Sequence, residues 1–167
     1  VDALARDLPV RPVIIGVGPA EPWLKARLPD AIFTGFLAGE PLGRAVASCD
    51  VLLNPSLTET FGNVTLEAMA SGLAVVLPTA PSTAALISSG LDGLEAPAST
   101  PAVYEGLVRS LVLAPAKRRA LGEAARRTSR RFGWRECCDA VLRTYQELGA
   151  VPLQSRIRRE RIIAGAA

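Results

Sequence analysis

The sequence predicts an α/β fold in which a parallel sheet is flanked by helices and followed by further helices at the C-terminal end. Short, continuously apolar runs of strand length recur along the first 100 residues. Most of these runs are followed by a segment whose apolar residues have helical spacing, and glycine or proline separates the two kinds of segment. Apolar strands that alternate with helices are typical of βαβ units and therefore of a parallel sheet.

The predicted strands are short and end at turn-forming residues. The first apolar run is rich in β-branched residues and ends in Gly16 and Gly18, which predict a buried strand followed by a tight turn. The run that ends at Pro78 has no charged residue. The predicted strand segments cover residues 12–19, 31–36, 51–55, 73–78 and 93–95.

Capping residues mark the predicted helices. Gly72 stands just past the C-cap of one helix, and Thr100 with Pro101 predicts the N-cap and first residue of another. Residues 1–7 are typical of the end of a helix. The other helices are predicted at residues 22–28, 42–48, 62–71, 82–89, from 101, from about 115, and at 134–148.

Composition excludes several kinds of chemistry. The chain has 167 residues, of which 49% are hydrophobic and 21% charged, as in an ordinary globular domain. It has no histidine, which removes Ser–His and Cys–His nucleophile pairs and most zinc sites. The odd set Cys49, Cys137 and Cys138, without an export signal, favours reduced thiols in a cytoplasmic setting. The start lacks an initiator Met, which indicates that the chain begins inside a larger protein.

The net charge of +3 conceals an asymmetry along the chain. Residues 1–100 carry a net charge of −5, whereas residues 101–167 carry +8. The basic half could face a polyanion or an anionic membrane surface, or it could be the solvated outer side of terminal helices. Residues 151–167 are expected to be a basic, flexible tail.

Two glutamates flank a predicted helix start. Glu59 lies in the loop after the strand at 51–55, and Glu67 lies inside the helix that begins near Gly62. The carboxyl ends of parallel strands carry ligand sites in open α/β sheets, and free amides at a helix start bind anions. Asn63 and Glu67 share a helix side, so Glu67 is expected to face a cleft, where it could accept hydrogen bonds from a vicinal diol, and Glu59 could do the same for a sugar.

A purely structural interpretation of the same residues stays open. Glutamates near a helix start stabilise the helix dipole or are simply solvated. Under this interpretation Phe61, Leu66 and Met69 belong to the core. In both interpretations the helix side opposite Asn63 and Glu67 is expected to be buried, and it consists of Leu66, Met69, Ala70 and Leu73.

The run from Pro55 to Gly72 closely resembles the signature of retaining glycosyltransferases of family 4, the glycosyl transferases group 1. Weaker similarity extends over about residues 5–148, as judged from the motif positions. The residues of this run are most similar to those of GDP-mannose-dependent bacterial α-mannosyltransferases. They also resemble those of sulfoquinovosyl and glucosyl transferases of lipid synthesis. The flanking segments that carry the resemblance are Ile14–Pro19, Phe33–Leu37, Cys49–Val51 and Phe132–Trp134.

The resemblance implies a fold and an activity. The fold is a Rossmann-like parallel sheet flanked by helices, the C-terminal half of a GT-B fold, with residues 1–150 as the nucleotide-sugar-binding domain. The activity is retaining transfer of a hexose from GDP-mannose, or from a UDP-sugar, to a lipid or glycan acceptor. No metal and no cofactor are expected, nor is a nucleic-acid partner. Peripheral contact with an anionic membrane on its cytosolic face stays open.

The resemblance also implies roles for individual residues. Glu59 is the implied catalytic residue, in contact with hydroxyls of the donor sugar, and Glu67 would bind the ribose diol. Backbone amides of the helix-start segment would contact the diphosphate or the sugar, namely those of Phe61, Gly62, Asn63, Val64 and Thr65. The residues beside the base would be Gly35, Phe36 and Leu37. Gly16 and Gly18 would let the backbone pass close to the donor.

The sequence departs from the family pattern in three places. The N-terminal acceptor half is absent, as is the first strand of the donor half, which usually carries an Arg and a Lys that neutralise the diphosphate. Residues 80–83, Ala-Pro-Ser-Thr, stand where many members have a glycine-rich turn. These departures favour a fragment that is inactive alone.

Other functions remain as alternatives. One is an inactive nucleotide-sugar-binding remnant or a structural partner domain. A glycoside hydrolase would also use two carboxylates, but an α/β half-domain is not typical of one. A nucleotide-sugar epimerase would usually bring acid/base histidines, which this chain lacks.

Overall fold

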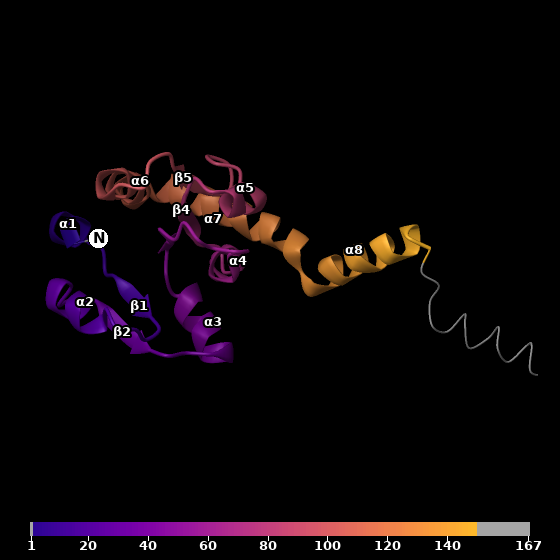
Figure 1. The fold of residues 1–167 in the computed structure, drawn as a ribbon. Helices are drawn as coiled ribbons and strands as arrows, with labels where there is room; N and C mark the ends of the chain where they lie inside the picture. Colours follow the sequence, from indigo (N-terminus) through magenta and orange to yellow (C-terminus); the bar gives the residue numbers. More distant parts are fainter. Residues whose placement is uncertain (1, 150–167) are drawn as a thin grey trace, which may run out of the picture. The chain divides into compact units, whose positions relative to one another are not determined.

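The computed structural model describes residues 2–149 and contains two compact units, one ending at Arg130 and the other beginning at Arg131. The predicted tail at residues 151–167 lies outside the described residues. The first unit holds every described strand, and Figure 1 shows its helices and strands in chain order. They are α1 (Asp2–Asp7), β1 (Val13–Ile15), α2 (Glu21–Arg27), β2 (Ile32–Gly35), α3 (Gly39–Ala47), β3 (Val51–Leu53), α4 (Asn63–Ala70), β4 (Ala74–Pro78), α5 (Pro81–Leu86), β5 (Leu94–Ala96), α6 (Pro101–Leu113) and α7 (Pro115–Ser129).

The described strands form two parallel sheets. One contains β1 and β2, and the other has the order β3-β4-β5, with Val51 opposite Ala74 and Val76 opposite Leu94. The parallel pairing and the α/β class confirm the prediction from sequence.

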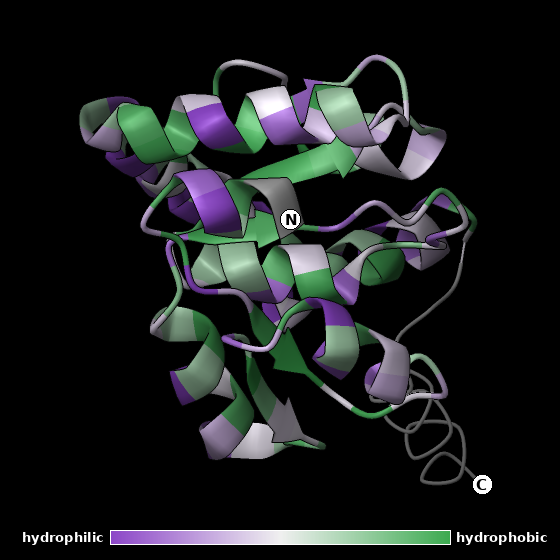
Figure 2. Ribbon diagram, turned by 90° about the vertical axis from the view of Figure 1, so that its left-hand side faces the viewer, coloured by the Kyte–Doolittle hydropathy of each residue, from purple (hydrophilic) through white to green (hydrophobic). Residues whose placement is uncertain are grey.

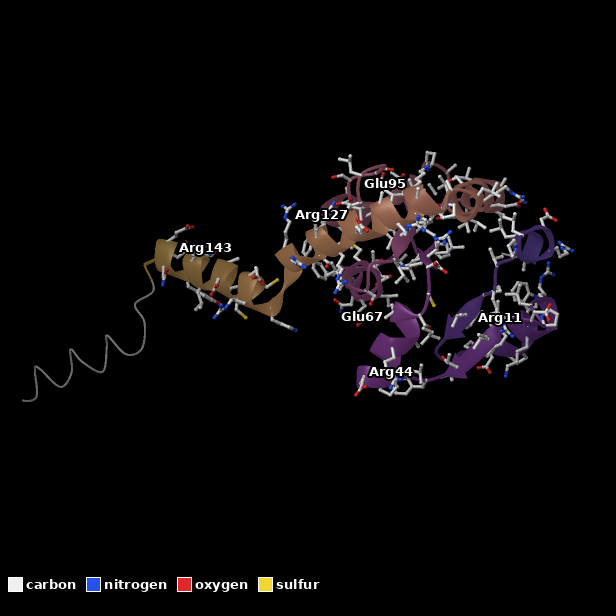
Figure 3. The ribbon with its side chains drawn as sticks, turned by 180° about the vertical axis from the view of Figure 1, so that it is seen from behind. Arg11, Arg44, Glu67, Glu95, Arg127 and Arg143 are labelled. Carbon is white, nitrogen blue, oxygen red and sulfur yellow. The ribbon has the colours of Figure 1, made fainter. Side chains whose placement is uncertain are left out.

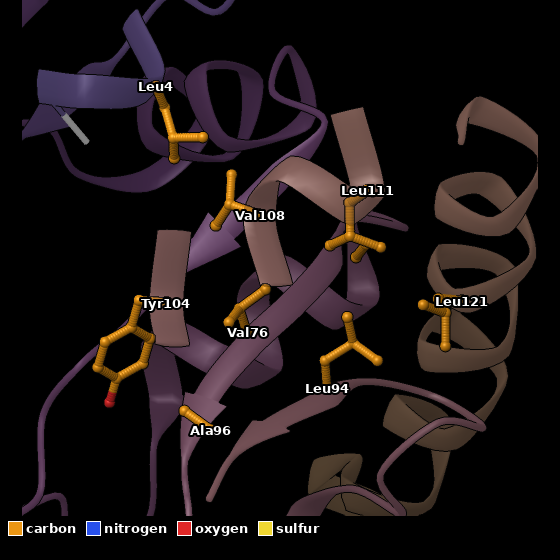
Figure 4. Packing of buried hydrophobic residues seen from close by; sticks show 9 residues of the cluster. Leu4, Val76, Leu94, Ala96, Tyr104, Val108, Leu111 and Leu121 are labelled. Carbon is orange, nitrogen blue, oxygen red and sulfur yellow. The ribbon is translucent and has the colours of Figure 1, made fainter. Parts of the chain in front are cut away.

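The core lies on the three-stranded sheet. Strand β4 is buried along its whole length, as expected for the central strand of a parallel sheet with helices on both faces. Residues from α1, α6 and α7 pack with β4 and β5, and Figure 4 shows these side chains meeting. Hydropathy colouring places apolar residues on the strands and polar ones on the outer helix faces (Figure 2). The buried cluster is Leu4, Ala74, Val76, Leu94, Ala96, Tyr104, Val108, Leu111 and Leu121.

Helix boundaries agree with their sequence signals at the end of α4 and the start of α6. Gly72 has a φ of +84° just past α4, in the left-handed region that ends a helix. The Thr100 hydroxyl accepts a hydrogen bond from the Val103 amide at 3.4 Å, which caps α6. Pro101 is the first residue of that helix, where its missing N–H costs nothing. The predictions for α3 and α5 were less accurate, since α3 begins at Gly39 rather than at residue 42 and α5 ends at Leu86, where Ile87 becomes extended, rather than at residue 89.

The predicted buried side of α4 was partly wrong. The buried residues of this helix are Thr65, Ala68 and Met69, whereas Leu66 is half-buried and Ala70 is exposed. The helix packs on both β4 and α7, so its buried side is turned toward α7 and includes small residues that allow close approach. Phe61, which the structural interpretation assigned to the core, is 45% exposed.

The second unit contains the amphipathic helix α8 (Trp134–Glu147), in which no residue is buried. A short 3-10 turn at Arg130–Phe132 precedes it. Cys137 and Cys138 are exposed free thiols, as expected for adjacent helical cysteines. Within residues 2–149, no helix is long and apolar enough to cross a membrane.

Candidate functional site

A small polar hollow opens where β3 and β4 end and their loops lead into α4 and α5. The loops after parallel strands meet at one edge of the sheet, and ligands bind at this edge in open α/β folds. Among the predicted site residues, Glu59, Gly62 and Thr65 line the hollow. The complete lining is Asn54, Ser56, Glu59, Gly62, Thr65, Leu77, Pro78, Ser82, Thr83 and Leu86.

Gly62 places the start of α4 at this hollow. Its φ of +89° lies in the left-handed region, and a Cβ there would lie 2.9 Å from Leu86 Cδ1. The Leu66 amide donates to the Gly62 carbonyl at 3.0 Å and is the first amide of the helical ladder. The amides of Asn63, Val64 and Thr65 therefore precede the ladder, and they form the positive end of the helix dipole. This end can receive an anionic or electron-rich oxygen.

Glu59 is held against the helix start. Its Cγ and the Thr65 Oγ1 each lie 3.6 Å from the point that a Cβ on Gly62 would occupy. The preceding loop is ordered by Asn54, whose Oδ1 accepts a hydrogen bond from the Ser56 amide at 3.1 Å. Glu59 is half-buried, so its carboxylate can face a ligand without being removed from water.

Glu67 occupies a different environment from Glu59. It is exposed on α4, as is Asn63 one turn earlier, and it does not line the hollow (Figure 3). The two predicted carboxylates thus lie on the same loop–helix segment but not in the same hollow. A ligand that contacts both must extend from the hollow along the exposed side of α4.

The predicted residues of the first sheet gather at the ends of β1 and β2. The Gly16 amide donates to the Gly35 carbonyl at 2.8 Å, and both glycines have positive φ, +121° and +69°. Gly18 and Phe36 are exposed, and Leu37 is half-buried. These five residues share one strand-end edge, and none of them lines the hollow at Glu59.

The structure adds polar residues that sequence reasoning did not assign to the site. Asn54 and Ser56 come from the end of β3, and Ser82 and Thr83 come from α5. Their position directly after predicted strands was the signal that could have found them, because strand-end loops form the ligand edge of the sheet. Residues 80–83 were noted only as a departure from a glycine-rich turn.

Some basic residues of the second half are used inside the domain. Arg109 donates to Asp7 at 3.0 Å and to Glu105 at 3.1 Å, and these hydrogen bonds raise the pKa of its guanidinium. Arg118 contacts the Asp50 carboxylate at 3.4 Å and donates to the Leu111 carbonyl at 3.0 Å. No lysine or arginine is among the described residues that line the hollow. A diphosphate bound beside the hollow would therefore depend on the amides at the start of α4 and on cations supplied from elsewhere.

Comparison with known families decides the membership of the chain. The family model for "Glycosyl transferases group 1" matches residues 1–112, which include the entire hollow. The chain belongs to the group 1 glycosyl transferases. The resemblance of the segment at Glu59–Glu67 to the family signature is thereby confirmed.

Individual members of the group 1 glycosyl transferases resemble this chain over different lengths. A "GDP-mannose-dependent alpha-mannosyltransferase" of Corynebacterium glutamicum is 44% identical over 82 residues, 49% of this chain and 20% of that protein. A protein of the same name from Mycolicibacterium smegmatis is 38% identical over 149 residues, 85% of this chain and 37% of that protein. The chain thus spans well under half the length of these relatives.

Solved structures of glycosyltransferases share the fold. The structure of HepE from Anabaena in complex with UDP superposes with a TM-score of 0.74 at 24% identity, covering 87% of this chain and 43% of that one. The structural neighbours are GT-B glycosyltransferases, and this group 1 domain has the corresponding parallel α/β architecture. The predicted fold class is confirmed.

Proposed function

We propose that this domain binds the nucleotide-sugar donor of a retaining hexosyltransferase, with GDP-mannose as the favoured donor. The observation that carries the proposal is the hollow at the ends of β3 and β4, where Glu59 lies beside the start of α4. Family membership and the names of the mycobacterial and corynebacterial relatives support a mannosyl donor. HepE has been solved in complex with UDP-glucose, which supports donor binding by this fold and leaves a UDP-sugar as the other donor class.

In the proposed complex the leaving group is the nucleoside diphosphate. Its charge grows as the bond to the sugar breaks, and the amides of Asn63, Val64 and Thr65 stabilise that charge without reorganising. Glu59 accepts hydrogen bonds from sugar hydroxyls and thereby orients the anomeric carbon. That the reaction needs no metal and no cofactor stays a prediction.

The nucleoside part of the donor extends away from the hollow. Glu67, on the exposed side of α4, accepts hydrogen bonds from the ribose diol. Gly35, Phe36 and Leu37 lie beside the base, and the exposed Phe36 ring provides an apolar surface for it. Gly16 and Gly18 carry no side chain that would hinder the backbone from approaching the donor.

We place the acceptor on residues beyond this chain. The chain spans 37% of the M. smegmatis relative, and the proposed acceptor-binding part corresponds to the remaining length of such proteins. Transfer requires a lipid or glycan acceptor to be held close to the anomeric carbon while water is excluded. The proposed role of this domain is therefore donor binding, and turnover belongs to the whole protein.

The substitution Glu67→Ala tests the donor orientation. Removing a carboxylate that accepts two hydroxyl hydrogen bonds should weaken GDP binding by about 1.5–3 kcal/mol, roughly 10- to 100-fold. Calorimetry with GDP and UDP on both proteins measures the change. Glu123→Ala, which removes an exposed glutamate of α7, is the matched control and should bind as the unsubstituted chain does. Equal GDP affinity in the Glu67 variant would contradict the ribose assignment.

A further inference from the structure

Two buried threonines line the hollow beside Glu59. Thr65 on α4 is 2% exposed and Thr83 on α5 is 4% exposed, and both line the hollow. Among the described residues, neither hydroxyl has a hydrogen bond to another protein group, and no fully buried side-chain oxygen lacks a partner. Both oxygens therefore open into the hollow. The described residues supply no partner for either hydroxyl, so a polar occupant of the hollow can hydrogen-bond to both.

The hollow limits the size of that occupant. Its volume is about 10 Å³, which is near the minimum for a single water-sized oxygen. A sugar ring or a phosphate group cannot enter, but one hydroxyl group can. The lining offers four hydroxyl groups that can donate, of which those of Thr65 and Thr83 belong to buried residues, and the Glu59 carboxylate, which can only accept.

We propose that the Thr65 and Thr83 hydroxyls form a subsite for one hydroxyl group of the donor hexose. This inference rests on the proposed function and adds to it a discriminating contact on the sugar. The hexose hydroxyl donates a hydrogen bond to the Glu59 carboxylate and accepts hydrogen bonds from the two threonines, so that all three groups are satisfied. Thr83 belongs to the segment at residues 80–83, where the sequence departs from a glycine-rich turn.

Contacts of α5 and of the segment after it position the subsite. Leu86 of α5 lies under Gly62, and the segment after α5 is tied to α7 through the buried Asp92. One carboxylate oxygen of Asp92 accepts from the Ser88 amide at 2.6 Å and the other from the Thr128 hydroxyl at 2.7 Å. Thr83 therefore belongs to a helix that approaches the start of α4 through Leu86 and is followed by a segment tied to α7.

The substitution Thr83→Val removes the hydroxyl while keeping the branched shape. We expect the affinity for GDP-mannose to fall about tenfold, because a buried sugar hydroxyl loses a partner. The affinity for GDP should not change, since GDP carries no hexose. Thr83→Ser, which restores a hydroxyl, should recover most of the GDP-mannose affinity. The measurement is calorimetry of GDP and GDP-mannose with the full 167-residue chain, and UDP with UDP-glucose serves as the second pair.

The outcomes separate this inference from the proposed function. Thr144→Val, on an exposed side of α8, is the matched control and should bind both ligands as before. If the unsubstituted chain binds GDP and GDP-mannose but Thr83→Val lowers neither affinity, the hollow holds only water and the subsite is wrong. Equal losses for GDP and GDP-mannose would show a structural effect and would also overturn it. Failure of the unsubstituted chain to bind any nucleotide would overturn the proposed function and the subsite together.

Discussion

Replacing Gly122 by alanine should destabilise the domain strongly, although alanine is the better helix former. Gly122 is a buried residue in the middle of α7. A Cβ built on it would lie 2.1 Å from the Gly72 carbonyl oxygen, and 3.0 Å from the Gly72 carbonyl carbon. These are backbone atoms that cannot rotate away, so α7 or the turn after α4 must move. Overpacking of this kind costs about 3 kcal/mol, which exceeds the roughly 1 kcal/mol gained from helix propensity.

Gly106 provides the matched control for Gly122. It also lies inside a helix, α6, but it is exposed and a Cβ there would meet nothing within 4 Å. Gly106→Ala should therefore stabilise the domain by about 0.5–1 kcal/mol. Urea unfolding of the three proteins, followed by circular dichroism, measures both changes. A Gly122→Ala protein as stable as Gly106→Ala would mean that α7 does not pack on the turn at Gly72 as described.

Replacing Gly62 by alanine should disrupt the proposed donor site as well as the fold. The φ of +89° costs an L-residue about 1–2 kcal/mol, and the new methyl group would meet Leu86 Cδ1 at 2.9 Å. Because Leu86 itself lines the hollow, a shift of its Cδ1 methyl group changes the wall of the hollow. We expect a loss of about 2–3 kcal/mol in unfolding free energy, consistent with strain plus overpacking. Donor binding should fall even at temperatures where the variant is folded.

The variant Gly39→Ala distinguishes the cost of backbone strain from the effect of displacing Leu86. The φ of Gly39 is +58°, but a Cβ there would meet nothing within 4 Å. Gly39→Ala should lose only the strain component of about 1–2 kcal/mol and should bind nucleotide normally. The two variants are compared by urea unfolding and by calorimetry with GDP. Normal GDP and GDP-mannose binding by folded Gly62→Ala would contradict the place of the α4 start in the donor site.

Local sequence patterns predicted most of the elements correctly. Apolar runs and their bounding turns predicted all five described strands, and the caps at Gly72 and Thr100 agree with the structure. These signals succeed because strand propensity, capping and turn formation depend mainly on neighbouring residues. The helix start at Gly62 was predicted for the same reason, and family membership of the segment around it is confirmed.

Side-chain surroundings were predicted less well, because they depend on distant partners. The buried side of α4 includes Thr65 and Ala68 since α4 packs against α7, which follows it by about 50 residues in the sequence. Phe61 was expected in the core under the structural interpretation but is largely exposed. The spacing of apolar residues along the chain does not show which of them are buried, because a helix presents several apolar residues and its packing partners decide which are covered.

The sequence alone determined the alternation of strands and helices, the signature around Glu59 and Glu67, and the family to which these residues belong. Only the tertiary structure decided that Glu59 shares a hollow with Thr65 and Thr83, while Glu67 on α4 faces outward. It also decided that α7 approaches the Gly72 turn closely enough to require a glycine at position 122. The physical reason is that secondary structure follows from adjacent residues, whereas a site and a close helix approach require segments far apart in the chain to meet.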